Sequence, residues 1–278
     1  MEAFKKQFNE YYWQYLLAKQ QEIKKIDKQA DEFYKQILLL AKSGKRLRPY
    51  FCYLGYSGFG GKDKKLIMNS AMALEVLHLF ALVHDDIMDK AKTRRGLDTV
   101  QNFIFKKTHD KHFSLSVALL AGDLIFSFSQ DLIAQNIYWQ KLKQELMVGQ
   151  YLDIKTTIKK NLEEKGILRI MELKTASYTV LRPLQIGAYL AGAAKTDIEK
   201  LADFALPAGV AFQIQDDIQG IDELNELNLA RLKGMDYCQK LSQDLITKAK
   251  KSLLNVKINK SVKKVLCQTA DYLIARKN

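Results

Sequence analysis

Three aspartates interrupt an apolar stretch in the first third of the chain. The segment EVLHLFALVHDDIMDKAKTRRG, residues 75–96, begins as an apolar helical pattern and ends in charge. Asp85 and Asp89 are four residues apart, so on a helix they lie one above the other, with Asp86 adjacent. Carboxylates this close repel each other unless a divalent cation lies between them. Mg²⁺ binds through one or two carboxylates together with phosphate oxygens and water, so the pattern predicts a magnesium site that faces a phosphate ligand.

A second acid pair ends another apolar stretch. The segment LADFALPAGVAFQIQDDIQG, residues 201–220, carries Gln213, Asp216 and Asp217 on one expected helix face. Acids on one apolar helix are easily explained by chance. Two apolar helices that both end in paired acids are much less expected by chance, and they favour a shared chemistry.

Arginine is used sparingly in this basic chain. Only eight of the 44 basic residues are arginine, and four of the eight form two short clusters, Arg46/Arg48 and Arg94/Arg95. The planar guanidinium group binds phosphate oxygens in a fixed, forked geometry, whereas lysine suits general surface charge. The arginine clusters are therefore candidates for anion binding.

The first arginine cluster and a later lysine each have neighbours in the sequence that suit anion binding. Gly44 and Pro49 predict a turn followed by the first turn of a helix, and Lys45 crowds with the first arginine cluster near that helix N-terminus, which attracts anions. A solvated basic loop is the alternative. Lys174 and Thr175 stand between apolar neighbours and offer a further anion contact. The alternative is that Lys174 lays its aliphatic stem along the core and places its ammonium group in solvent.

Composition limits the classes of protein that this chain could be. Hydrophobic residues make up 47% and charged residues 27%, which is typical of a globular protein, and only three prolines occur in 278 residues, which favours an all-α fold. Three widely spaced cysteines exclude a disulfide framework and a cysteine-rich zinc site, and suit the reducing cytoplasm. Neither a signal peptide nor a transmembrane segment is expected. The net charge of +13 is compatible with nucleic acid, an anionic membrane or phosphorylated small molecules.

The periodicity predicts helices along nearly the whole chain, without an internal repeat or an interdomain linker, so we expect one domain over residues 1–278. Pro183 should kink or interrupt the helix in which it lies. The expected helical segments are 1–42 as one helix or two, 50–56, 66–90, two within 100–140, 142–161, 162–194, 198–220 and an amphipathic tail over 235–278.

Together these groups describe a pocket for diphosphates and metal ions. The apolar residues that precede each acid pair would line a hydrophobic cavity, which suits a prenyl chain. A metal-bound diphosphate is a good leaving group, and a dry cavity protects the resulting allylic cation from water.

The chain resembles the trans-prenyltransferase, or polyprenyl synthetase, family. The motifs that carry the resemblance follow one another in the family's order and span nearly the whole chain. They are GKRLRP at 44–49, EVLH at 75–78, HDDIMD at 84–89, RRG at 94–96, AGD at 121–123, GQYLD at 149–153, KTASYT at 174–179 and FQIQDD at 212–217. The forms DDIMD and DDIQGI look most like archaeal-type geranylgeranyl diphosphate synthases.

The resemblance implies a fold, an activity and a set of site residues. The family fold is a bundle of mostly antiparallel helices around a central apolar cavity, usually in a homodimer. The implied reaction condenses isopentenyl diphosphate with an allylic prenyl diphosphate to give a short-chain all-trans product, and it implies no nucleic-acid partner. Isopentenyl diphosphate would be held by Lys45, Arg48, His78 and Arg95. Mg²⁺ would be held by Asp85, Asp86, Asp89 and Asp216. The allylic diphosphate would be contacted by Arg94, Lys174, Thr175 and Gln213. The catalytic residues among these would be Asp85, Asp86, Asp89 and Lys174.

Product length should depend on the residues one helical turn before Asp85. These are Phe80 and Ala81, which would point down the cavity. An aromatic side chain at position 80 resembles the floor residue of synthases that stop at twenty carbons. An ordinary core role for Phe80 is the alternative.

The sequence departs from the family near residues 222–236. The family normally continues after the second acid motif with a lysine-bearing mobile loop, whereas this chain has DELNELNLARLKGMDYCQ. Three explanations are open: a loop missing from the recorded sequence, a shortened active enzyme, or a non-catalytic subunit that regulates an active partner.

Head-to-head prenyl condensing enzymes and terpene cyclases also carry paired acids, but GKRLRP and RRG suit a second diphosphate substrate and favour chain elongation.

Overall fold

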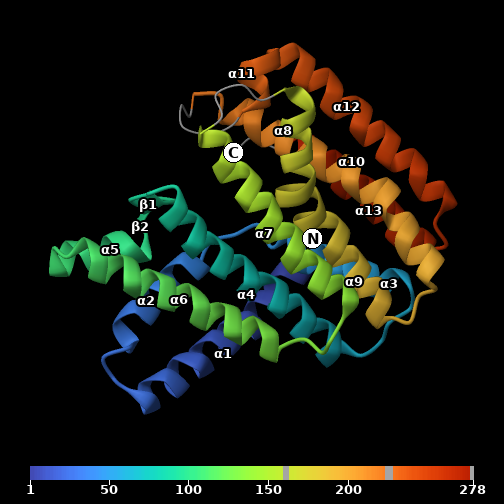
Figure 1. The fold of residues 1–278 in the computed structure, drawn as a ribbon. Coiled ribbons are helices and arrows are strands. Elements are labelled where there is room, and N and C mark those ends of the chain that lie inside the picture. The colour runs from blue at the N-terminus through green and yellow to red at the C-terminus, as the bar shows by residue number, and fades with distance from the viewer. Residues whose placement is uncertain (159–162, 223–227, 276–278) are drawn as a thin grey trace. The chain divides into compact units, whose positions relative to one another are not determined.

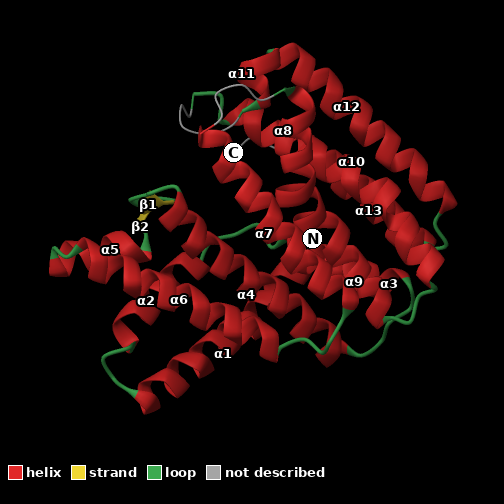
Figure 2. Cartoon of the chain, viewed as in Figure 1, coloured by secondary structure: helices red, strands yellow, loops and turns green. Residues whose placement is uncertain are grey.

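The computed structural model describes residues 1–158, 163–222 and 228–275. Helices make up nearly all of it, as the sequence predicted, and the one small sheet is a pair of two-residue strands (Figure 2). The chain divides into two compact units, Met1–Tyr50 with Met68–Ala134, and Phe51–Ile67 with Gln135–Asn278. We call them unit 1 and unit 2. The prediction of a single domain over 1–278 stays a prediction.

Unit 1 is built from four complete helices, the strand pair and parts of two longer helices. The complete helices are α1 (Glu2–Ile26), α2 (Asp31–Ala41), α5 (Val100–Thr108) and α6 (Lys111–Asp131). The strands are β1 (Thr93–Arg94) and β2 (Leu97–Asp98), and the helices that cross the boundary between the units are α3 (Leu47–Gly58) and α4 (Lys64–Met88). The first 42 residues therefore form two helices, and the aromatic spacing of α1 buries Phe8 and Tyr12 with stacked rings 5.6 Å apart.

Close packing of α4 and α6 depends on Gly122. A Cβ atom at this position would lie 2.2 Å from the ring of His84 on α4. Only glycine leaves room for the imidazole here, so this small residue serves the packing of the two helices.

Unit 2 contains the remaining helices, several of them side by side in Figure 1. They are α7 (Ile137–Ile158), α8 (Glu164–Met171), the π-helix η1 (Glu172–Leu181), α9 (Arg182–Leu190), α10 (Lys195–Gln219), α11 (Leu229–Lys233), α12 (Met235–Ser252), the 3₁₀ turn η2 (Leu253–Asn255) and α13 (Lys260–Ala275). The single helix expected over 162–194 is thus three segments, and Pro183 lies in the first turn of the last one, where its missing N–H is tolerated.

The shortened stretch that the sequence predicted near 222–236 lies partly outside the described residues, because 223–227 are not among them. Residues 228–236 are described. They form the short helix α11 and the start of α12.

Among the residues that the structure describes, two helices, α4 and α6, are long and apolar enough to cross a membrane by length and composition. In α4 72% of the most apolar window is buried inside the protein, and in α6 39% is buried. Burial of this kind is typical of a core helix for α4. The expected absence of a transmembrane segment stays a prediction.

Candidate active site

The first acid group lies where α4 ends. The N–H of Ala91 donates to the carbonyl of Asp86 at 2.9 Å, and Lys90 adopts the left-handed conformation with φ 54°, as in a Schellman motif. The N–H of Asp89 still donates to the carbonyl of Asp85 at 2.8 Å. The two acids therefore remain one turn apart, as their spacing predicted.

The three acids differ in exposure. Asp85 is partly exposed and Asp89 is exposed, whereas Asp86 is only 2% exposed. A buried carboxylate needs a partner that neutralises it. The sequence placed the three acids together but gave no sign of this difference.

The partner is Arg94, which a tight hairpin returns to the acids. Arg94 on β1 pairs with Leu97 on β2, and the two residues between them, Arg95 and Gly96, both have positive φ values, 53° and 76°. Positive φ at both central positions is the requirement of the two-residue turn that matches strand twist. The glycine of the RRG motif therefore serves the turn that aims the first arginine.

Arg94 binds both adjacent aspartates. Its Nε donates to Oδ1 of Asp86 at 2.6 Å, and its Nη2 donates to Oδ2 of Asp85 at 3.3 Å. Burial raises the pKa of Asp86 to about 6, although the charge and hydrogen bond of Arg94 oppose the rise. Oδ2 of Asp86 is buried and has no hydrogen-bond partner within the described ranges.

The first basic cluster is divided between core and surface. Arg46 is 4% exposed, and its Nη1 forms an ion pair with Glu75 at 2.5 Å while its Nε donates to Asn9 at 3.0 Å. The expectation that Arg46 belongs to an anion site is wrong, because its guanidinium group is committed to the core. Lys45 is exposed and Arg48 is partly exposed, so both remain candidates.

Positive charge gathers around His78. Burial lowers the pKa of His78 well below its usual value, and the charges of Arg48, Arg95, Arg94 and Arg46 lower it further. The imidazole is therefore neutral at pH 7. Arg95 is exposed, and its Nη1 donates to the carbonyl and the hydroxyl oxygen of Ser43, both at 3.0 Å.

The residues proposed to set chain length belong to an aromatic group in unit 1. Phe80 is 6% exposed, and its ring lies 4.6 Å from that of His84 and 5.1 Å from that of Phe126 on α6. Ala81 is partly exposed. Packing between α4 and α6 fixes the position of the Phe80 ring.

In unit 2, η1 carries Lys174 and Thr175 between two close helix contacts. A Cβ atom at Gly149 of α7 would lie 3.0 Å from the backbone N of Lys174, and one at Gly209 of α10 would lie 2.4 Å from the Cα of Ala176. π-helical turns occur often at functional sites. Here the irregular turn is held on both sides by helices that carry glycine at the contact.

Lys174 and Thr175 on η1 each have a partner from the motifs nearby. Nζ of Lys174 forms an ion pair with Asp153 on α7 at 2.5 Å, and the hydroxyl of Thr175 donates to Oε1 of Gln213 on α10 at 2.7 Å. Sequence reasoning gave no role to Asp153. Its place in the GQYLD motif was the signal that could have found it.

The two acids of the second pair differ in exposure, as those of the first pair do. Asp216 is partly exposed, whereas Asp217 is 5% exposed and accepts from Nε2 of Gln213 at 3.0 Å and from the backbone N–H of Leu229 at 2.6 Å. The sequence placed Asp217 on the acid face without assigning it a role.

The acids suit a metal ion whose coordination is completed by oxygen atoms of a bound ligand. Within residues 1–158, 163–222 and 228–275, no group of three or more His, Cys, Asp or Glu could hold a metal ion. Mg²⁺ at phosphate sites takes only one or two carboxylates from the protein. Asp85, which is partly exposed, and Asp89, which is exposed, fit that donor set at the end of α4.

A cavity of about 690 Å³ lies elsewhere, between α1 and α2. Its lining contains none of the predicted site residues and no carboxylate. The residues that line it are Trp13, Leu17, Lys35, Leu38, Leu39 and Lys42.

Comparison with known proteins identifies the family. The family model "Polyprenyl synthetase" matches residues 30–269. The chain belongs to the polyprenyl synthetase family. The match covers both acid groups and both sets of basic residues, so the family that the motifs resembled is confirmed.

Relatives in this family include archaeal enzymes. A geranylgeranyl diphosphate synthase from Sulfolobus acidocaldarius is 35% identical over 198 residues, which cover 66% of this chain and 56% of the relative. One from Methanosarcina mazei is 31% identical over 221 residues, which cover 75% of this chain and 64% of the relative. The chain thus spans less than two thirds of the length of these relatives.

Solved structures of this family share the fold. The geranylgeranyl pyrophosphate synthase of Corynebacterium glutamicum, solved with isoprenyl diphosphate and magnesium, has a TM-score of 0.86 at 22% identity, with 98% of each chain covered. The Geoglobus acetivorans enzyme has a TM-score of 0.78 at 24% identity, again with 98% of each chain covered. At such identities the likeness shows the all-helical fold of this polyprenyl synthetase.

Proposed function

We propose that the chain is a magnesium-dependent prenyltransferase that condenses isopentenyl diphosphate with an allylic diphosphate to make a short-chain all-trans prenyl diphosphate of geranylgeranyl or farnesyl length. The observation that carries the proposal is the contact of Arg94 with Asp85 and Asp86 at the end of the apolar helix α4. Family membership and the archaeal relatives support the same activity.

The proposed roles follow exposure and charge. Asp85 and Asp89 on α4 and Asp216 on α10 would hold Mg²⁺, which when bound would stabilise negative charge on the leaving diphosphate. Asp86, which the sequence grouped with the metal ligands, would instead hold Arg94 in place, because it is buried against that guanidinium group. Arg94 and the η1 residues Lys174 and Thr175, with Gln213, would bind the allylic diphosphate.

The second diphosphate has its own group in unit 1. Lys45, Arg48 and Arg95 would bind isopentenyl diphosphate around the neutral imidazole of His78. The like charges that lower the pKa of His78 would be offset by the bound anion. Reaction would break the allylic C–O bond, form a C–C bond from the isopentenyl double bond, and release one proton, which the departing diphosphate would accept.

The alternative of a non-catalytic subunit is not favoured. A subunit without activity would not need a buried aspartate that is held by a dedicated arginine beside two outward acids. The decisive experiment is incubation with Mg²⁺, isopentenyl diphosphate and each allylic diphosphate in turn, followed by sizing of the products. A short-chain prenyl diphosphate is expected, and no product under any condition would contradict the proposal.

Phe80 would set product length, with Ala81 beside it. Phe80→Ala should lengthen the product, because it removes the ring that packs against Phe126 and His84. Tyr272→Ala, at an aromatic position on α13 that is 40% exposed, is the control and should leave the product unchanged. An unchanged product profile in the Phe80 variant would remove it as the floor residue.

A cytoplasmic homodimer is the assembly we propose. Within unit 1, α6 leaves Phe113, Leu119 and Leu120 exposed, at 50%, 41% and 65%. Exposed apolar side chains on one helix are typical of a subunit contact. Sedimentation of the wild type and of Leu120→Lys tests this, with a dimer expected for the former and dissociation for the latter; a wild-type monomer would contradict it.

A further inference from the structure

A continuous hydrogen-bond chain links η1 to α11 through α10 in unit 2. It runs from the hydroxyl of Thr175 to the amide of Gln213 at 2.7 Å, from that amide to the carboxylate of Asp217 at 3.0 Å, and from the carboxylate to the N–H of Leu229 at 2.6 Å. The first two members are the residues that the proposed function assigns to the allylic diphosphate. Asp217 has no assigned role.

The carboxylate dictates the direction of every bond in this chain. An ionised Asp217 can only accept, so both Leu229 and Gln213 must turn an N–H toward it. The carbonyl oxygen of Gln213 then faces Thr175, whose hydroxyl must donate to it. The second amide hydrogen of Gln213 has no partner within the described part of the chain, and the side chain is partly exposed.

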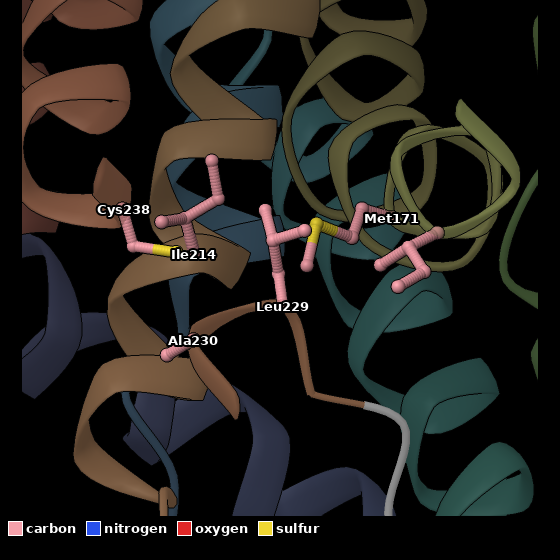
Figure 3. Close-up of a cluster of buried hydrophobic side chains, with 6 residues drawn as sticks. Met171, Ile214, Leu229, Ala230 and Cys238 are labelled. Carbon is pink, nitrogen blue, oxygen red and sulfur yellow. The ribbon is translucent and has the colours of Figure 1, made fainter. Parts of the chain in front are cut away.

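The far end of the chain is anchored in the core. Leu229 is fully buried, and Figure 3 shows it between Ile214 of α10 and Met171 of α8. The side chain of Asn228 accepts from the N–H of Arg231 at 3.0 Å as the N-cap of α11. The same side chain donates to the carbonyl of Asp217 at 2.7 Å.

We propose that Asp217 is a positioning residue for diphosphate binding: it orients the amide of Gln213 so that the remaining N–H is presented to a diphosphate oxygen, and it is itself fixed by the start of α11. The ligand class rests on the proposed function. Asp217 does not touch the ligand in this account, and its neighbour Asp216 remains the candidate metal ligand. The start of α11 supplies this support through the N–H of Leu229.

The test is Asp217→Asn, which keeps the shape of the side chain but leaves one acceptor oxygen for two N–H donors. Either Gln213 turns round or α11 loses its bond. We expect the affinity for inorganic pyrophosphate with Mg²⁺, measured by calorimetry, to fall about tenfold, the cost of one misdirected hydrogen bond to a charged group. The KM for the allylic substrate should rise by a similar factor, with the KM for isopentenyl diphosphate within twofold of the wild type.

Two further variants separate positioning from stability. Asn228→Ala removes the cap that holds the Asp217 backbone without touching the carboxylate, so a weaker loss of pyrophosphate affinity is expected, about threefold. Leu253→Ala truncates a leucine in unit 2 that is 2% exposed and far from this chain of bonds in sequence. It should lower stability and leave pyrophosphate affinity unchanged.

Each outcome decides one of the two proposals. Wild-type affinity in Asp217→Asn, an equal loss in Leu253→Ala, or no pyrophosphate binding by the wild type would overturn the role of Asp217. If the wild type binds pyrophosphate with the expected dependence on Asp217 but makes no prenyl product, the proposed function fails and the positioning role stands. If the wild type makes product and Asp217→Asn behaves like it, only the positioning role fails.

Discussion

The ends of α4 and α10 carry the same pair of adjacent aspartates, and the chain supports the two pairs by different means. In each pair the first acid is partly exposed and the second is buried, Asp86 at 2% and Asp217 at 5%. At the end of α4 the buried acid meets a charged partner, Arg94, which a hairpin returns to it. At the end of α10 the buried acid accepts from the amide of Gln213 and from the backbone N–H of Leu229.

The difference teaches that one acid motif can be held in two ways. A charge-assisted bond to arginine is short and strong and brings a cation to the site. A backbone N–H and an amide bring no net charge but link the acid to core packing around Leu229. We infer that the pair on α4 responds mainly to changes of charge, and the pair on α10 to changes of packing.

The largest effect should come from the first acid of the α4 pair. Asp85→Asn should lower turnover by about a thousandfold, the scale for removal of one group that stabilises transition-state charge. Asp131→Asn is the control and should keep wild-type turnover. The side chain of Asp131 is mostly exposed, and its carboxylate is 3.8 Å from the ammonium group of Lys19. Full activity in the Asp85 variant would show that the metal assignment is wrong.

The next effect concerns the buried ion pair beneath the basic cluster. Glu75→Gln leaves the charge of Arg46 buried without its partner, so the free energy of unfolding should fall by about 3 kcal/mol. Both side chains are almost fully buried, at 3% and 4% exposure. Urea unfolding at pH 7 measures this fall in the free energy of unfolding. A fall smaller than the one caused by breaking an exposed pair, such as Lys250–Asp271, would contradict the structural role of Arg46.

Arg94→Lys tests the charged partner directly. Lysine keeps the charge but cannot reach both acids with one forked group, so turnover should fall about 10- to 100-fold, as for other residues that orient metal ligands. Arg169→Lys alters an exposed arginine that pairs with Glu172 at 2.6 Å and should have no effect on turnover. Equal turnover in the two variants would remove the distinction between the two acid pairs.

The smallest effect concerns the support of η1. The guanidinium group of Arg182 donates to Glu145 at 2.8 Å, and the hydroxyl of Ser177 on η1 donates to the same carboxylate. Burial raises the pKa of Glu145, but these hydrogen bonds outweigh it and hold the pKa below its usual value. Glu145→Gln should therefore lower stability by about 1 kcal/mol at pH 7, since both groups are partly exposed.

The pH dependence of that loss follows from the sign of the shift. A carboxylate whose pKa is lowered by folding stabilises the protein above its unfolded-state pKa, and the contribution is lost as the pH falls through the folded-state pKa. The difference between wild type and Glu145→Gln should shrink below about pH 4.5. A constant difference down to pH 3 would exclude the ion pair as its cause.

The sequence could predict the fold class and the positions of both acid pairs, because helix periodicity and spacing are local properties. It predicted that Asp85 and Asp89 lie one turn apart, and that Pro183 kinks or interrupts its helix. It could not predict which acid of each pair is buried, since that depends on the hairpin at Arg95 and Gly96 and on the packing of Leu229. Nor could it predict the π-helical turn at Lys174, which close contacts from Gly149 and Gly209 hold in place.

The central claim is that in each pair the first acid serves the metal and ligand, while the second holds the structure of the site. The most direct test is the Mg²⁺ concentration needed for half-maximal turnover in four single variants, Asp85→Asn, Asp86→Asn, Asp216→Asn and Asp217→Asn. We predict a rise of about tenfold or more for the first acid of each pair, the cost of one lost ligand interaction. The second-acid variants should keep the wild-type Mg²⁺ requirement even where turnover falls. An equal rise in Asp86→Asn or Asp217→Asn would contradict the account.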